Sequence, residues 1–174
     1  ETDFNLFEKT VDKTNNTLIY RLNFAHKILG PLVKDKDIVE LGCGSGFLAK
    51  KFLDLGAKTY TGYDISENAI NRAKKLSEHF NNSGNIKFFA KPILELEKLD
   101  SHFVFSLGLT DWLTDEEIDH MFKISIDCES LHSISEKRFS FGRILHQLYV
   151  FLSYGYKTGG YSPRYLDSKK ICSK

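Results

Sequence analysis

Apolar and polar positions follow two different rhythms along the chain, and each rhythm predicts a type of element. Short apolar runs predict strands, whereas apolar residues recurring every three to four positions predict helices. We expect strands at Asp37–Leu41, Thr59–Asp64, Ile86–Ala90, Phe103–Leu107 and Ser130–Ser135. We expect helices at Leu18–Leu32, Gly46–Leu55, Glu67–Phe80, Asp115–Ser125 and Ser140–Ser153.

The regular alternation of strands and helices predicts an α/β domain with a parallel sheet. The clearest helix start is at Ser66, which can cap the helix, followed by Glu67 at its positive N-terminal end. No long linker, repeat or low-complexity tract interrupts the pattern. We therefore expect a single domain over residues 1–174, with a helical lead-in (1–36), a core (37–153) and a C-terminal segment (154–174).

Composition adds few constraints to this picture. The 174 residues are 41% hydrophobic and 27% charged, with a formal net charge of +1, which is typical of a soluble globular domain. No apolar run approaches the roughly eighteen residues of a membrane helix, and the N-terminus does not resemble a signal peptide. We therefore expect a cytoplasmic protein without a membrane or nucleic-acid partner. Three widely spaced cysteines indicate reduced thiols rather than disulfides or a zinc site.

The stretch "ELGCGSGF", residues 40–47, is the strongest candidate for a binding site. It contains Gly42, Gly44 and Gly46 where the first strand turns into a helix, at the sheet edge where open α/β folds bind ligands. Glycine allows positive φ and a close approach of the backbone to a ligand. A tight turn with nothing bound is the simpler alternative, but three alternating glycines behind an acidic residue favour a ligand.

Two nucleotide sites fit this stretch poorly. A dinucleotide site requires a small residue directly after Gly46, where this chain has Phe47. A P-loop requires a Gly-Lys-Ser/Thr sequence, which the chain lacks. A nicotinamide-dependent dehydrogenase is therefore only a weak alternative.

The stretch resembles motif I of the class I S-adenosylmethionine-dependent methyltransferases, with Glu40 before "LGCGSG". The sequence "YTGYDIS" supports the resemblance, because it ends a strand with Asp64 about twenty residues after the glycines. The resemblance implies a Rossmann-like, doubly wound sheet of order 3-2-1-4-5 with helices on both faces. It also implies an enzyme that uses S-adenosyl-L-methionine and releases S-adenosyl-L-homocysteine.

The resemblance further implies a role for individual residues. Glu40 would orient the amino end of the cofactor's methionine part, Asp64 would hold the ribose, and Ile65 would lie against the adenine. Ser106 and Leu107 would flank the methionine part, and Trp112 would cover it or serve as a core residue instead. The remaining cofactor residues would be those of the glycine loop: Gly42, Cys43, Gly44, Ser45 and Gly46.

The chain departs from the family after the third strand. Many members have an acid there that accepts a hydrogen bond from the adenine amino group, whereas this chain has Pro92. Adenine recognition would then depend on the Ile93 backbone and on apolar stacking. This departure motivates an alternative function, a methyltransferase-like binding or scaffold protein without catalysis.

Candidate residues for the methyl acceptor lie later in the chain. The loop "GLTDWLTDEE" lacks the Asn/Asp-Pro-Pro-aromatic signature of methylation on nucleobases and on glutamine. Asp111 is the candidate catalytic base, with His132 as a second candidate, although a helix cap and a structural histidine are the simpler interpretations. Arg138 and Arg143 would bind an anionic acceptor. We therefore expect methyl transfer to oxygen or nitrogen of a small polar or anionic molecule.

The end of the chain is shorter than the family pattern implies. Family members close the sheet with an antiparallel pair of strands, for which the segment after residue 157 is too short. We expect that these closing strands are missing from this chain.

Overall fold

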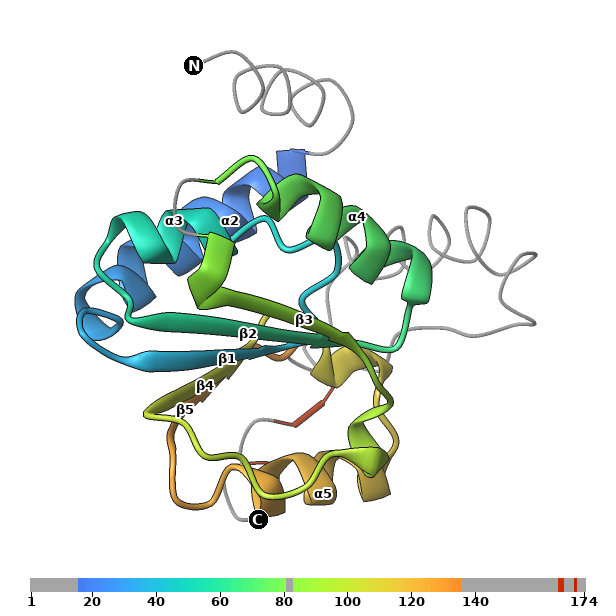
Figure 1. Ribbon diagram of the computed structural model, residues 1–174. Helices are drawn as coiled ribbons and strands as arrows, with labels where there is room; N and C mark the ends of the chain where they lie inside the picture. Colours follow the sequence, from blue (N-terminus) through green and yellow to red (C-terminus); the bar gives the residue numbers. More distant parts are fainter. Residues whose placement is uncertain (1–15, 81–82, 136–165, 168–170, 172–174) are drawn as a thin grey trace.

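The computed structural model describes residues 16–80, 83–135, 166–167 and 171 (Figure 1). Its centre is a sheet of five strands, in the order β3-β2-β1-β4-β5. The strands are β1 (Asp37–Leu41), β2 (Thr59–Asp64), β3 (Ile86–Ala90), β4 (Phe103–Ser106) and β5 (Glu129–His132). All four neighbouring pairs are parallel. The predicted Rossmann-like fold and its strand order are confirmed.

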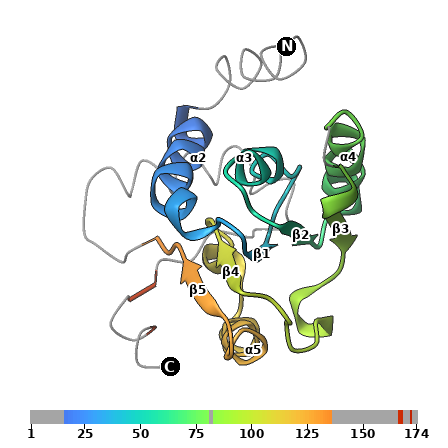
Figure 2. The ribbon, with the colours of Figure 1, turned by 60° about the vertical axis from the view of Figure 1, so that its left-hand side comes forward.

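Helices cover both faces of the sheet. Figure 2 shows α2 (Asn16–Leu29), α3 (Ala49–Asp54) and α4 (Glu67–Ser77) on one face and α5 (Asp115–Ile124) on the other. Short 3₁₀ turns complete the connections: η1 (Gly30–Leu32), η2 (Ser83–Asn85), η3 (Ile93–Glu95) and η4 (Thr110–Trp112). None of the described helices combines the length and apolar character needed to cross a bilayer.

The core consists of two apolar clusters, one on each face of the sheet. Side chains of a strand point alternately to its two faces. In β4, Phe103 and Phe105 accordingly join the cluster beneath α2, α3 and α4, whereas Val104 joins the cluster beneath α5. Every residue of β4 is buried, as expected for a strand covered on both sides.

Strand bounds agree with the pattern more closely than helix bounds do. β1, β2 and β3 have their predicted bounds. The first helix ends at Leu29, because Pro31 follows and the chain continues as a 3₁₀ turn. The next helix begins at Ala49 rather than Gly46, since Gly46 has a φ of +71°, outside the helical region. The helix predicted at Ser140–Ser153 lies outside the described residues.

Candidate functional site

The glycine loop is anchored to the carboxyl end of β2. The backbone N–H groups of Gly42 and Cys43 both donate to the Tyr63 carbonyl, at 2.8 and 3.0 Å. Gly42, Gly44 and Gly46 have φ values of +72°, +54° and +71°, a region that other residues rarely adopt. The alternating glycines therefore allow the chain to leave β1, bend toward β2 and reach the start of α3.

Two of these glycines have different surroundings. A Cβ atom on Gly46 would lie 2.5 Å from Cζ of Phe88, so this glycine is required for packing against β3. A Cβ atom on Gly44 would meet no atom within 4 Å. The backbone at Gly44 thus leaves open space beside the loop, where a ligand can approach.

The Asp64 carboxylate is held by backbone groups from two sides. Its Oδ2 accepts the N–H of Gly44 at 2.8 Å, and its Oδ1 accepts the N–H of Ser66 at 2.9 Å. An ionised carboxylate has about four lone-pair sites, so each oxygen keeps room for another donor. Asp64 is therefore fixed in place and can accept two further hydrogen bonds, such as those of a vicinal diol.

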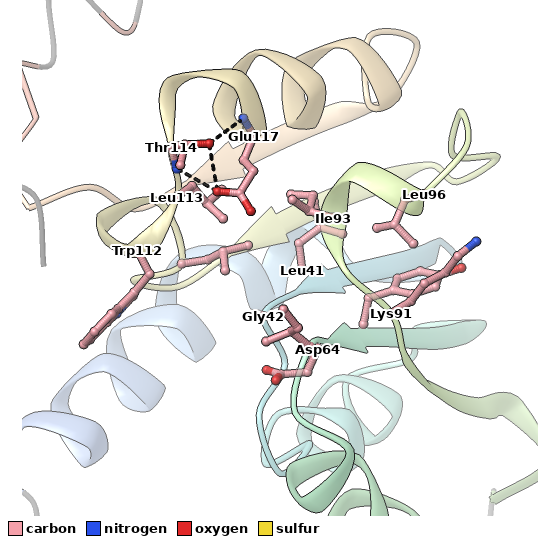
Figure 3. A pocket seen from close by; sticks show the side chains of 13 residues that line it. Leu41, Gly42, Asp64, Lys91, Ile93, Leu96, Trp112, Leu113, Thr114 and Glu117 are labelled. Carbon is pink, nitrogen blue, oxygen red and sulfur yellow. Dashed lines mark hydrogen bonds between the residues drawn. The ribbon is translucent and has the colours of Figure 1, made fainter. Parts of the chain in front are cut away.

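A cavity of about 410 Å³ opens beside Asp64 (Figure 3). This volume lies within the usual range of small-molecule sites. The lining is mostly apolar and comes from the ends of β1 and β2, from the segment around η3, and from the segment between β4 and α5. The lining residues are Leu41, Gly42, Tyr63, Asp64, Ile65, Lys91, Ile93, Leu96, Leu109, Trp112, Leu113, Thr114 and Glu117.

Five of the predicted cofactor residues line this cavity: Gly42, Asp64, Ile65, Ile93 and Trp112. Ile65 and Trp112 are 74% and 41% exposed, so both lie at its rim. The predicted residues that do not line it are Glu40, Cys43, Gly44, Ser45, Gly46, Ser106 and Leu107. The cofactor roles of all twelve residues stay predictions.

Glu40 is buried beneath the loop and accepts a hydrogen bond from the Tyr60 hydroxyl. Burial raises the pKa of this carboxyl to about 8, although the Tyr60 bond opposes the shift. The side chain is therefore mainly protonated at neutral pH. Burial likewise raises the pKa of the neighbouring Cys43 thiol, which keeps the thiol protonated.

The two candidate catalytic residues, Asp111 and His132, each contact a serine. Asp111 is 4% exposed, and its two oxygens accept the N–H and the hydroxyl of Ser135 at 2.8 and 2.5 Å. Nδ1 of His132 lies 2.9 Å from Oγ of Ser106. Burial lowers the pKa of His132 to about 4, so the ring is neutral at physiological pH. Neither residue lines the cavity, and their catalytic roles stay predictions.

Arg138 and Arg143, the predicted acceptor-binding residues, lie outside the described residues. The sequence interpretation also missed several cavity residues, of which Lys91, Thr114 and Glu117 are polar. Thr114 and Glu117 form a capping box at the start of α5. Its Thr-x-x-Glu signature is visible in the sequence. This signal predicts the helix start but not that both side chains border a cavity.

Solved methyltransferase structures share this fold. Magnesium protoporphyrin IX methyltransferase from Synechocystis PCC 6803 aligns with a TM-score of 0.62 and 19% identity, over 99% of this chain and 83% of that one. The CcbJ methyltransferase from Streptomyces caelestis aligns with a TM-score of 0.56 and 22% identity, over 67% of this chain and 52% of that one. At such identities the likeness concerns the fold.

Curated relatives match shorter stretches at higher identity. The ribosomal protein L11 methyltransferase of Shewanella piezotolerans is 47% identical over 45 residues, which are 26% of this chain and 15% of that protein. The one from Haemophilus influenzae strain PittEE is 39% identical over 57 residues, which are 33% of this chain and 19% of that protein. The chain thus spans less than a fifth of the length of these two relatives.

These relatives correct one expectation from the sequence. We expected a partner that is only a small molecule, with nucleic acid excluded. The names of the relatives give a protein of the ribosome as the acceptor. The restriction to small molecules and the exclusion of nucleic acid were therefore wrong, because the near-neutral overall charge on which they depended describes the whole chain and not the acceptor surface.

The family assignment comes from a match over most of the described sheet. Residues 38–127 match the model of the methyltransferase domain family. This range extends from β1 through α5 and includes the glycine loop, Asp64 and every residue that lines the cavity. The chain belongs to the methyltransferase domain family.

Proposed function

We propose that this chain binds S-adenosyl-L-methionine in the cavity beside the glycine loop and transfers the methyl group to an oxygen or nitrogen nucleophile. The observation that carries this proposal is the fixed Asp64 carboxylate, which can accept both hydroxyls of a ribose at the edge of a cavity of about 410 Å³. Family membership supports the reaction class. Two solved structures with this fold are described with bound S-adenosylhomocysteine and S-adenosylmethionine.

The residues of the cavity suit the parts of this cofactor. Asp64 would hold the ribose, and the apolar side chains of Ile65, Ile93 and Leu113 would surround the adenine ring. The open backbone at Gly44 would leave room for the chain that leads to the sulfonium group. The cofactor supplies an electrophilic methyl group on sulfur, and the protein has to align an acceptor with it.

The reaction is a direct displacement. A lone pair of the acceptor forms a bond to the methyl carbon, and the carbon–sulfur bond breaks with its electrons passing to sulfur. The products are the methylated acceptor, S-adenosyl-L-homocysteine and a proton. Alignment and exclusion of water supply most of the catalysis when the acceptor is already a good nucleophile.

A second candidate function is binding of the methyl donor without turnover. The contacts of Asp111 and His132 favour it, because both side chains are engaged with serines and neither lines the cavity. In this case binding of the methyl donor would affect how the protein interacts with a partner, and no methyl group would be transferred.

Calorimetric titration with S-adenosylhomocysteine and, separately, with NAD tests the proposal. We expect micromolar affinity for S-adenosylhomocysteine, on the order of −8 kcal/mol, and no heat with NAD. Tight binding of NAD without a response to S-adenosylhomocysteine would contradict the proposal. Incubation with S-adenosylmethionine and a cell extract, followed by mass spectrometry of released S-adenosylhomocysteine, separates the two functions. Binding without release would favour the second candidate.

A further inference from the structure

The cavity has a second carboxylate, that of Glu117 in the first turn of α5. Its Oε2 accepts the N–H of Thr114 at 2.7 Å and the Thr114 hydroxyl at 2.9 Å. Its other oxygen, Oε1, accepts no hydrogen bond from the part of the chain that the structure describes. Figure 3 shows this second oxygen pointing away from Thr114, toward the space between Leu113, Ile93 and Leu41. Capping thus occupies one oxygen and directs the other into the cavity.

Glu117 and Asp64 lie on opposite sides of the cavity. Asp64 comes from the end of β2 and Glu117 from α5 (Figure 3). Among the described residues that line the cavity, these two are the carboxylates. An adenosine group has two matching features at its opposite ends, the ribose hydroxyls and the exocyclic amino group of the adenine.

The wall formed by η3 offers little to that amino group. Its lining side chains, Ile93 and Leu96, are apolar. The carbonyls of Pro92 and Ile93 already accept the N–H groups of Glu95 and Leu96, at 3.1 Å each. Pro92 itself has neither a side-chain acceptor nor a backbone donor. Each of these carbonyls keeps one lone pair, but the side chains of Ile93 and Leu96 offer no acceptor, whereas Glu117 brings a carboxylate oxygen from α5.

We propose that Glu117 determines specificity for adenine, by accepting a hydrogen bond from the exocyclic amino group with the oxygen that faces the cavity. This inference rests on the proposed function, since it assigns one residue of the same site. A carboxylate accepts hydrogen bonds and donates none when ionised, so it favours a 6-amino purine over a 6-oxo purine. Once a bound purine covers this oxygen, an acceptor without a donor is unfavourable, which is the basis of discrimination against the 6-oxo ring.

The test compares two ligands on three proteins. The ligands are S-adenosylhomocysteine and S-inosylhomocysteine, which carries an oxygen in place of the 6-amino group. The proteins are the wild type, Glu117→Gln and the matched control Glu116→Gln, which removes an exposed carboxylate from the same turn outside the cavity lining. The glutamine carbonyl can keep the bond to Thr114, so that its NH₂ group faces the cavity. The substitution then replaces an acceptor by a donor.

The readout is the dissociation constant of S-inosylhomocysteine divided by that of S-adenosylhomocysteine. This ratio compares both ligands on the same folded protein. We expect the wild type and Glu116→Gln to prefer S-adenosylhomocysteine by tenfold or more, the usual effect of one hydrogen bond to a charged group. In Glu117→Gln the ratio should fall by at least tenfold, toward equal binding or a preference for the 6-oxo ligand.

Three results would overturn the inference in distinguishable ways. A Glu117→Gln protein that keeps the wild-type ratio would limit Glu117 to capping α5. If the wild-type protein binds S-adenosylhomocysteine and S-inosylhomocysteine equally well, Glu117 does not select adenine, and its role is likewise limited to capping α5. A wild-type protein that binds neither ligand would overturn the proposed function, and the role of Glu117 with it.

Discussion

The Asp64 carboxylate accepts the backbone N–H of Gly44 at 2.8 Å and so joins two residues that are twenty positions apart in the sequence. Gly44 can direct its N–H toward this carboxylate with a φ of +54°, which other residues adopt at a cost. The glycine loop and the acid at the end of β2 therefore form one unit. This unit is fixed before any ligand binds, so the ribose acceptor requires little rearrangement.

Removing the Asp64 carboxylate should weaken cofactor binding more than it weakens the fold. Asp64→Ala should raise the dissociation constant for S-adenosylhomocysteine by tenfold or more, because each hydrogen bond to a charged group contributes about 1.5–3 kcal/mol. The melting temperature should also fall, since Gly44 and Ser66 lose an acceptor. Calorimetry and a thermal melt measure the two effects.

The control for Asp64 is Asp54→Ala. Asp54 forms an exposed ion pair with Lys50 on α3, of the kind that contributes little to stability. Affinity and melting temperature should both stay near the wild-type values. If Asp64→Ala binds S-adenosylhomocysteine as tightly as Asp54→Ala does, the ribose lies elsewhere.

Alanine substitutions at Gly44 and Gly46 should have different main effects, one on ligand affinity and the other on the free energy of unfolding. Both residues have positive φ, so each substitution costs about 1–2 kcal/mol of backbone strain. Gly46→Ala should lose roughly 1–3 kcal/mol more, because its Cβ would overlap the Phe88 ring. Gly44→Ala should fold better and bind S-adenosylhomocysteine less tightly, since its Cβ occupies the open space beside the loop. Urea unfolding and calorimetry on both variants check this order, and equal unfolding free energies would contradict it.

The half-buried His132 should make the fold sensitive to acid. Its pKa is lowered from 6.5 to about 4 by burial, so below pH 6.5 the unfolded chain binds a proton that the folded chain does not. This difference should remove stability as the pH falls from 6.5 to 4, by on the order of 3 kcal/mol in total. His132→Phe should show a weaker loss over this window in unfolding measurements. Glu40, whose raised pKa acts in the opposite direction, is unchanged in the variant and cancels in the comparison.

The Asp111–Ser135 contact should behave as a structural pair. Asp111→Ala should lower the free energy of unfolding by about 1–3 kcal/mol, because the Ser135 N–H loses its acceptor. Ser135→Ala removes the hydroxyl bond. A double-mutant cycle should give a coupling of at least 0.5 kcal/mol. A variant of Asp111 with wild-type stability and lost turnover would instead support the catalytic role that the sequence suggested.

The sequence predicted the positions of the main elements better than the partners of their side chains. Asp64 and the glycines were found because a strand end and positive φ leave local signals. Glu40 carries no local sign that Tyr60 will donate to it. The two strands meet in register, with Ile38 opposite Tyr60 and Glu40 opposite Gly62, and this pairing, which brings Tyr60 near Glu40, becomes visible only in the sheet.

The contacts of the candidate catalytic residues depend on tertiary structure in the same way. The partner of Asp111 is 24 positions away, and that of His132 is 26 positions away. Both pairs form where β4 and the loop after it meet β5 and the residues that follow it. A single sequence shows that an acid and a histidine occur near strand ends, but not which groups they face.

A crystal structure of the protein with S-adenosylhomocysteine tests the central claim most directly. The account predicts the nucleoside in the cavity beside the glycine loop, with both ribose hydroxyls within hydrogen-bond distance of the Asp64 carboxylate and the adenine between Ile65 and Ile93. A nucleoside bound at another surface, or a ribose held by a residue other than Asp64, would contradict it.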